Sequence, residues 1–172
     1  DYDDINFNSN DKLIEIIDNE IDIKFCKDSI INGKIGNGER NKIKVVFTPI
    51  HGTSIITIPS VFRDSGYKNF EIVEEQSIPD GNFPTVISPN PEETEALSMA
   101  LNKANKIDAD IVIGTDPDSD RLGIAVRNEN NELELLNGNQ IMIVLTNFVL
   151  EKENLRDLNN PGLLYTSDAA DD

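Results

Sequence analysis

The chain has 172 residues, which is enough for one domain with a substantial core and part of a neighbouring domain. Its 32 acidic residues outnumber its 15 basic residues and give a formal net charge of -17, which argues against binding to nucleic acid or to an anionic membrane surface. The single cysteine excludes an internal disulfide framework, and no apolar run approaches the ~20 residues of a membrane span, so we expect a cytoplasmic protein.

Apolar residues at spacings of three and four predict a first helix that begins at Ser9 or Asn10 and ends near Ser29. The apolar face of this helix would carry Leu13, Ile16, Ile17 and Ile21. The next segment, residues 32–41, is rich in glycine, asparagine and charged residues, and we expect it to be an exposed connector.

A strand is predicted at Ile43–Phe47, and a turn follows it. The helix after this turn is expected to end at Gly66, and Pro59 either lies in the first turn of that helix or bends it. Residues 70–75 predict a second strand. Residues 76–84 predict a loop, because they contain the turn sequence Pro-Asp-Gly.

A third helix is predicted from Asn90, which would be its N-cap, with Pro91 in the first position and Glu93 in the first turn. Its apolar stripe would consist of Leu97, Ala100, Leu101 and Ala104. The continuous apolar run at residues 109–115 then predicts a central strand that is covered on both faces.

Residues 122–126 predict an antiparallel neighbour of that central strand. The alternation of strands and helices is typical of an α/β protein, and we expect a three-layer α/β/α domain with a mixed, mostly parallel sheet. A last helix begins near residue 137 and is apolar around much of its circumference. It is therefore expected to be buried on several sides, as the first element of a further domain.

Three aspartates alternate directly after the central strand, in the segment GTDPDSDRLGIAV at residues 114–126: Asp116, Asp118 and Asp120. In an extended loop, alternate side chains emerge on one side, so the three carboxylates converge. Protonation or a divalent cation would relieve their mutual repulsion, and carboxylate oxygens favour magnesium, calcium or manganese. Open α/β sheets also place their ligands at the carboxyl ends of strands.

Several alternatives to a metal site are open. A solvated acidic turn is the simplest in so acidic a chain. A phosphatase of the haloacid dehalogenase type would use Asp116 as its nucleophile, although Asp120 occupies the position of its usual hydroxyl residue. A non-enzymatic acidic binding module is a third alternative. An EF-hand calcium loop is excluded, because positions six and twelve, counted with Asp116 as the first, hold Arg121 and Arg127 instead of glycine and glutamate.

Arg121 follows the last aspartate and is either their counterion or a contact for a phosphate beside the metal. The second role is favoured, because the planar guanidinium matches the geometry of phosphate oxygens. A metal with an arginine alongside is what phosphoryl transfer requires.

At this point the sequence resembles the α-D-phosphohexomutase superfamily, the phosphoglucomutases and phosphomannomutases, and in particular the second of their four domains. Four blocks carry the resemblance in the family's order: VVFTPIHGTS (45–54), EEQSIPDGNFPTVISPNPEE (74–93), the aspartate segment and NGNQ (137–140). With a proline after Asp116, the segment resembles the phosphoglucomutase, phosphomannomutase and phosphopentomutase branch more than it resembles the phosphoglucosamine mutases.

The resemblance implies roles for individual residues. Asp116, Asp118 and Asp120 would bind Mg2+, and Arg121 would contact a phosphate. In the family's reaction, a phosphoserine of another domain donates its phosphate to a sugar phosphate, and the bisphosphorylated intermediate returns the other phosphate. His51, the chain's only histidine, would be either a general acid or base or a structural residue.

The resemblance also implies what is missing. The chain lacks the family's serine block and its downstream sugar-recognition and phosphate-binding loops, so we expect an inactive fragment of a phosphosugar mutase, which shares its phosphosugar substrate with the remaining domains of the parent chain. The expected boundaries are residues 1–136 for the metal-binding domain, of which 1–9 are flexible, 137–162 for the first helix of the next domain, and 163–172 for a tail foreign to the natural sequence.

Overall fold

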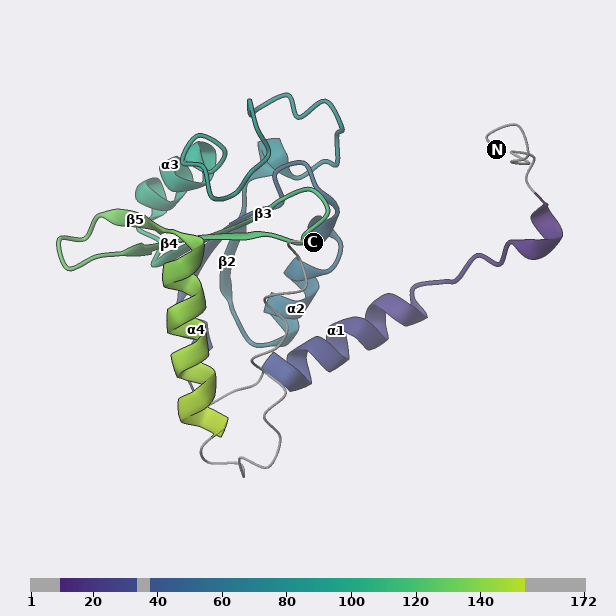
Figure 1. The fold of residues 1–172 in the computed structure, drawn as a ribbon, viewed down its shortest axis with the longest axis horizontal. Coiled ribbons are helices and arrows are strands. Elements are labelled where there is room, and N and C mark those ends of the chain that lie inside the picture. The colour runs from purple at the N-terminus through teal and green to yellow at the C-terminus, as the bar shows by residue number, and fades with distance from the viewer. Residues whose placement is uncertain (1–9, 34–37, 154–172) are drawn as a thin grey trace.

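A computed structural model describes residues 10–33 and 38–153 of the chain. At its centre lies a five-stranded sheet with the strand order β2-β1-β3-β4-β5 (Figure 1). The strands are β1 (Lys44–Thr48), β2 (Asn69–Ile72), β3 (Ile111–Thr115), β4 (Leu122–Arg127) and β5 (Leu133–Leu136). The flexible start expected at residues 1–9 and the foreign tail expected at 163–172 lie outside the described residues.

The sheet is mixed, which confirms the predicted class. β1 pairs in parallel with β2 and β3, whereas β4 pairs antiparallel with β3 and β5. Consequently β1, β2, β3 and β5 run in one direction and β4 runs against them. The sequence pattern did not predict β5, because a run of four residues is too short to show a period.

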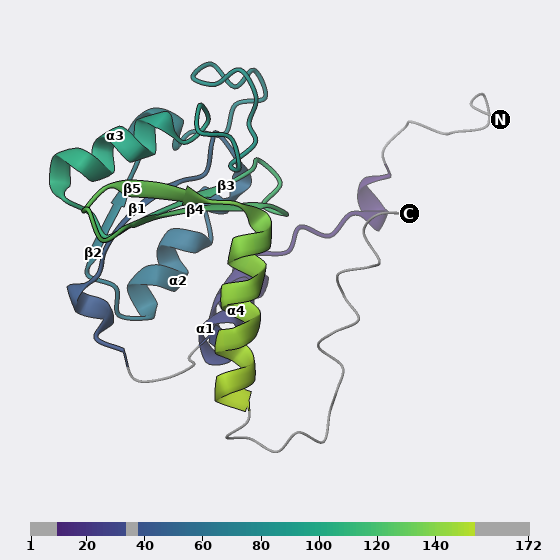
Figure 2. The same cartoon turned by 60° about the vertical axis from the view of Figure 1, so that its left-hand side comes forward.

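Helices cover both faces of the sheet, as predicted. Figure 2 shows α3 on one face and α2 on the other, where α1 packs against α2. The helices are α1 (Glu20–Gly33), α2 (Ile58–Asp64), α3 (Ser98–Ile107) and α4 (Gly138–Glu153). Pro59 lies in the first turn of α2, which confirms the first of the two alternatives for that helix.

The central strands are buried from both sides. Val46 of β1 and Val112 of β3 belong to one buried cluster with alanines of α3. The next residue of β1, Phe47, stacks on Phe70 of β2, whose ring stacks on Phe62 of α2. Successive side chains of β1 therefore pack against opposite layers, as the alternation of a strand requires.

The first helix begins later than predicted. Only Asp11–Leu13 form a short 3-10 turn near the expected start, and α1 begins at Glu20. Leu13 and Ile16 are 83% and 88% exposed, so their helical spacing has no surface to pack against among the described residues. An apolar period without tertiary burial is too weak to hold a short helix.

The third helix also begins later than predicted, at Ser98 instead of just after Asn90. The Asn90 side chain does accept a hydrogen bond from the amide of Glu92 at 3.1 Å, but this bond closes an isolated turn. The predicted stripe is confirmed in part, because Leu97, Ala100 and Ala104 are buried. The segment 91–97 lies against the sheet instead of continuing the helix.

The burial predicted for the last helix is not found among the described residues, and its place as the first element of a further domain stays a prediction. In α4, Ile141 is buried, whereas the neighbouring apolar side chains are exposed: Met142, Ile143, Val144 and Leu145. The helix begins with a capping box, since Gln140 donates its amide to Asn137 Oδ1 at 3.0 Å and Gln140 Oε1 accepts from the Asn137 amide at 2.9 Å. In the part of the chain that the structure describes, no helix combines the length and apolarity needed to cross a membrane.

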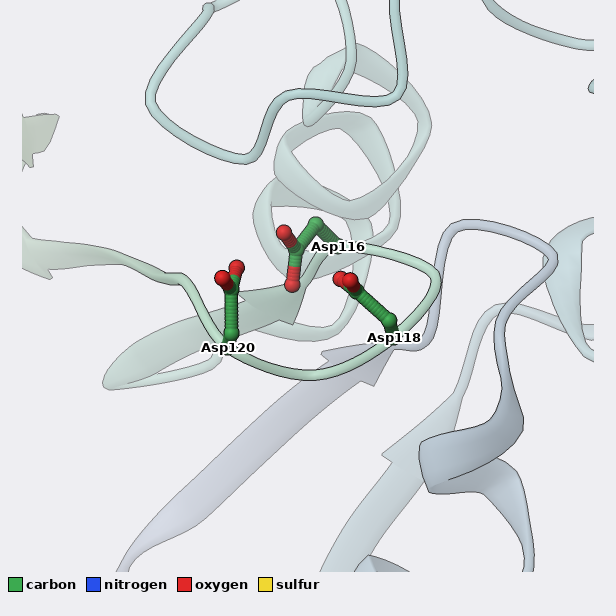
Figure 3. Close-up of side chains that lie close together, drawn as sticks. All are labelled: Asp116, Asp118 and Asp120. Carbon is green, nitrogen blue, oxygen red and sulfur yellow. The ribbon is translucent and has the colours of Figure 1, made fainter. Parts of the chain in front are cut away.

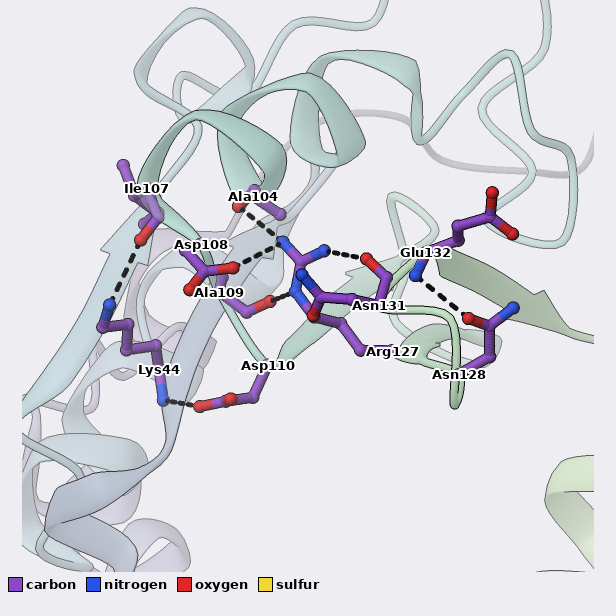
Figure 4. A network of polar contacts seen from close by, with 10 residues as sticks. All are labelled: Lys44, Ala104, Ile107, Asp108, Ala109, Asp110, Arg127, Asn128, Asn131 and Glu132. Carbon is purple, nitrogen blue, oxygen red and sulfur yellow. Dashed lines mark hydrogen bonds and ion pairs between the residues drawn. The ribbon is translucent and has the colours of Figure 1, made fainter.

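Arg127, the last residue of β4, joins three elements at the amino end of β3 (Figure 4). Its Nε donates to the carbonyl of Ala109 at 2.7 Å, and its Nη1 donates to the carbonyl of Asn131 at 2.8 Å. Its Nη2 donates to the carbonyl of Ala104 in α3 at 3.3 Å. These bonds fix α3 and the β4–β5 turn relative to β3.

Candidate metal centre

The loop Asp116–Arg121, called the aspartate loop below, leaves the carboxyl end of β3 beside β1. The chain passes from β1 to β2 on one side of β1 and then returns to β3 on the other side. The order of the parallel strands therefore reverses between β1 and β3. Open α/β sheets bind ligands at the carboxyl ends of the strands at such a point, so the topology itself favours a site here.

The three predicted aspartates come together in this loop (Figure 3). Asp116, Asp118 and Asp120 each offer one carboxylate oxygen, and these oxygens lie within 4.8 Å of one another. Asp116 is buried, whereas Asp118 and Asp120 are exposed. The alternation in the sequence thus has the expected result, since one buried and two exposed carboxylates face a common point.

Asp116 also holds the loop in shape. Its Oδ1 accepts a hydrogen bond from the amide of Arg121 at 3.0 Å, and its backbone carbonyl accepts one from Ser119 at 3.1 Å. Ser119 takes a positive φ of 68°, a conformation that closes the loop tightly. A side chain at the start of the loop and an amide at its end are therefore in direct contact.

The oxygen cluster suits a small divalent cation. Donors bound at about 2.1 Å to octahedral Mg2+ are about 3 Å apart when adjacent and about 4.2 Å apart when opposite. The separations in the loop, up to 4.8 Å, are slightly wider, and the exposed side chains of Asp118 and Asp120 have room to rotate inward. Three carboxylates leave further coordination positions for water or phosphate oxygens. The triad can therefore hold a metal ion.

Arg121 lies at the end of the loop with its side chain 61% exposed. Its Nε is 3.8 Å from Asp120 Oδ1, which is a long, solvated ion pair that contributes little stability. The guanidinium makes no hydrogen bond to a described residue, so it has donors for an incoming anion. Its predicted contact with a phosphate stays a prediction.

The segment that follows β1 holds the aspartate loop through Pro117. The carbonyl of Pro117 accepts hydrogen bonds from the amide and the hydroxyl of Thr53, at 2.9 and 3.1 Å. A Cβ on Gly52 would lie 2.4 Å from Pro117 Cα, so only glycine permits this approach. A second contact joins the same two segments, because the hydroxyls of Ser54, one residue after Thr53, and of Thr115, two residues before Pro117, are hydrogen-bonded at 2.7 Å.

One glycine on each side of the aspartate loop allows the segment that precedes α3 to pack closely against the sheet. A Cβ on Gly114 would lie 2.4 Å from Leu97 Cδ2, and a Cβ on Gly123 would lie 2.0 Å from the carbonyl oxygen of Pro91. Both strands that carry the loop are thereby covered by residues 91–97. This packing explains why Pro91 does not begin a helix.

His51 lies in the turn that follows β1 and is 4% exposed. Its Nδ1 is 3.0 Å from the carbonyl of Ile78, and its Nε2 is 2.9 Å from the hydroxyl of Thr85. Both ring nitrogens are thus engaged by protein partners, an arrangement that favours the structural alternative over acid–base catalysis.

Sequence reasoning missed the residues that support the loop: Gly52, Thr53, Gly114, Pro91 and Gly123. Glycines on both sides of an acidic loop were the available signal, because a glycine within a strand often marks a close approach of another backbone. Their partners are distant in the sequence and could not be assigned from it.

The chain matches a known protein family. Residues 26–130 match the family model described as phosphoglucomutase/phosphomannomutase, alpha/beta/alpha domain II. A phosphoglucomutase of Staphylococcus epidermidis is 38% identical over 140 residues, which are 81% of this chain and 25% of that protein. A phosphoglucomutase of Staphylococcus aureus is 42% identical over 122 residues, 71% of this chain and 22% of that protein.

A solved structure shares the fold. The chain matches a phosphoglucomutase/phosphomannomutase family protein from Burkholderia thailandensis with a TM-score of 0.61 and 24% identity, over 77% of this chain and 26% of that chain. At this identity the likeness shows the fold alone. The chain spans about a quarter of the length of the first curated relative it matches.

Proposed function

This chain belongs to the phosphoglucomutase/phosphomannomutase domain II family, and on that premise we propose that it supplies the metal-binding domain of a phosphosugar mutase. The observation that carries the proposal is the convergence of Asp116, Asp118 and Asp120 at the reversal point of the sheet. A solvated acidic turn has no need of a buried carboxylate that organises its own loop.

The proposed metal is Mg2+, since hard carboxylate oxygens and open coordination positions suit it. When bound, it would neutralise the charge of phosphate oxygens. Asp118 and Asp120 would bind it from the exposed side, and Asp116 would bind it while keeping the loop closed. Arg121 would orient a phosphate through its free guanidinium donors.

The proposed reaction is the isomerisation of a phosphosugar, for example glucose 1-phosphate to glucose 6-phosphate, by phosphoryl transfer through a phosphoserine and a bisphosphorylated sugar. The phosphoserine and the sugar-binding groups would come from other domains of a longer chain. Curated relatives about four times as long as the matched region support this part of the proposal. A cytoplasmic location belongs to the proposal as well, and the single cysteine is consistent with it.

Isothermal titration of the 172-residue chain with Mg2+ alone tests the site. Asp118→Asn and Asp120→Asn are each expected to lower the affinity at least about tenfold, since even outer-shell partners of metal ligands contribute 10–100-fold. Glu129→Gln is the matched control, because it also removes one negative charge but lies on the exposed turn between β4 and β5.

Two outcomes contradict the proposal. If both aspartate variants bind Mg2+ as tightly as the wild type, the loop is not the site, and the acidic binding module gains support. If beryllofluoride forms a stable adduct at Asp116, that residue is a nucleophile, and the phosphatase alternative replaces the mutase domain.

A further inference from the structure

His51 lies in a turn with an unusual backbone. Ile50 and His51 have consecutive positive φ values of 45° and 59°. For a β-branched residue such as Ile50 this conformation is strained, and it persists only where surrounding contacts hold it. The turn follows β1 directly and precedes Gly52 and Thr53, the two residues that contact the aspartate loop.

Backbone hydrogen bonds hold the turn from both sides. The amide of His51 donates to the carbonyl of Gln76 at 2.9 Å, and the carbonyl of His51 accepts from the amide of Asp80 at 3.1 Å. Within the turn, Gly52 donates to the carbonyl of Pro49 at 2.8 Å. The segment 76–80 is therefore attached to the backbone of the turn itself.

The His51 side chain is the last acceptor in a series of hydrogen bonds whose donors and acceptors follow one order. The amide of Ile50 donates to Thr48 Oγ1 at 3.1 Å, and Thr48 Oγ1 donates to Gln76 Oε1 at 2.6 Å. Gln76 Nε2 donates to Thr85 Oγ1 at 3.0 Å, so the Thr85 hydroxyl is free to donate to His51 Nε2 at 2.9 Å.

The other ring nitrogen fixes the tautomer. Nδ1 faces the carbonyl oxygen of Ile78, which can only accept, so Nδ1 carries the hydrogen. Nε2 is then the acceptor for Thr85. In a doubly protonated ring, Nε2 would donate to Thr85, and the hydroxyl hydrogen of Thr85 would lose its partner among the described residues. Each donor in this series of hydrogen bonds thus has its acceptor when His51 is neutral.

We propose that His51, as the neutral Nδ1–H tautomer, is a positioning residue of the aspartate loop. It ties the segment 76–85 to the strained turn after β1, and the turn presents Gly52 and Thr53 to Pro117, between the first two aspartates. The part of this inference that concerns metal affinity rests on the proposed function. The tautomer and the shape of the loop do not.

The first test is the 15N NMR spectrum of the imidazole at neutral pH, which is unambiguous because the chain has 1 histidine. We expect a protonated Nδ1 and an unprotonated Nε2. The opposite tautomer, or an averaged signal from a mixture of tautomers, overturns the proposal. A purely space-filling histidine would have no reason to show a single tautomer.

The second test uses Thr85→Val, which keeps the shape of the side chain and removes the hydroxyl. We expect the variant to fold and the NMR signals of the Ser119 and Arg121 amides to shift. We also expect Mg2+ to bind about three- to tenfold more weakly, which is at or below the smallest loss of affinity usual for residues that contact metal ligands directly. Thr94→Val is the matched control, because Thr94 is exposed and makes no side-chain hydrogen bond to a described residue. Unchanged loop signals in Thr85→Val overturn the proposal.

His51→Asn and His51→Ala form a rescue pair. Asparagine tolerates the positive φ and keeps a donor near the carbonyl of Ile78, so it should restore part of the Mg2+ affinity that alanine loses. Equal Mg2+ affinities of the two variants contradict the positioning role. If His51→Ala does not fold, the result for Thr85→Val tests the proposal instead. If the wild type itself binds no Mg2+, the proposed function fails, while the tautomer and the loop signals still decide this inference.

Discussion

The carbonyl oxygen of Pro117 accepts two hydrogen bonds from Thr53, one from its amide at 2.9 Å and one from its hydroxyl at 3.1 Å. Pro117 separates the first two aspartates of the candidate metal centre, and Thr53 belongs to a different strand connection. The position of the aspartate loop therefore depends on the segment after β1 as well as on β3.

Thr53→Val removes one of these two bonds and leaves the other. We expect a loss of about 1 kcal/mol in the free energy of unfolding, the usual net contribution of one hydrogen bond, and weaker Mg2+ binding because Pro117 gains freedom. Urea denaturation and calorimetric titration measure the two effects. Thr53→Ser keeps the hydroxyl and should behave as the wild type in Mg2+ affinity; a serine variant as weak as the valine variant would argue against the hydrogen bond.

Mg2+ should stabilise the folded chain. A ligand that binds only the folded state adds about 2.7 kcal/mol at a concentration 100 times its Kd. We expect the urea midpoint to rise with Mg2+ and to return after chelation, whereas in an Asp118→Asn/Asp120→Asn double variant Mg2+ should raise the midpoint no more than sodium chloride of equal ionic strength does. Sodium chloride at equal ionic strength is the control, because screening of the net charge of -17 also stabilises the fold. An equal rise with sodium chloride would attribute the effect to screening.

Gly123→Ala should destabilise the chain by about 3 kcal/mol or more, at the upper end of overpacking effects. The new Cβ would lie 2.0 Å from the carbonyl oxygen of Pro91, and a backbone atom on a packed segment has little room to move. Gly81→Ala is the control, because a Cβ there meets open space. Comparable stability of the two variants in urea denaturation would show that the segment 91–97 does not press on β4.

Arg127→Lys should cost about 2–4 kcal/mol, because a lysine keeps the charge but replaces at most one of three hydrogen bonds to backbone carbonyls. The ion pair with Asp108 adds little, since that carboxylate is 74% exposed. Arg63→Lys, on the exposed side of α2, is the matched control. If thermal and urea unfolding show the same stability for Arg127→Lys as for Arg63→Lys, Arg127 does not hold α3 and the β4–β5 turn against β3.

Several features follow from the sequence alone. Spacing and apolar runs identify the central strands, because burial between two helical layers requires continuous apolar side chains. The alternation of the three aspartates places their carboxylates on one side of a loop, and their position after β3 indicates a ligand site. These features depend on local geometry, and each can be read within a few residues.

Long-range packing decided the rest. Residues 10–19 have a helical pattern without a helix, since no described element buries their apolar side chains. The predicted helix does not start at Asn90, because Pro91 and Leu97 pack against two glycines of the β3–β4 hairpin instead. His51 carries chemistry that its sequence context leaves open, and only partners up to 34 residues away assign its hydrogen bonds. The identity of the candidate ligands was thus local information, whereas their support is a property of contacts between segments that meet only in the folded chain.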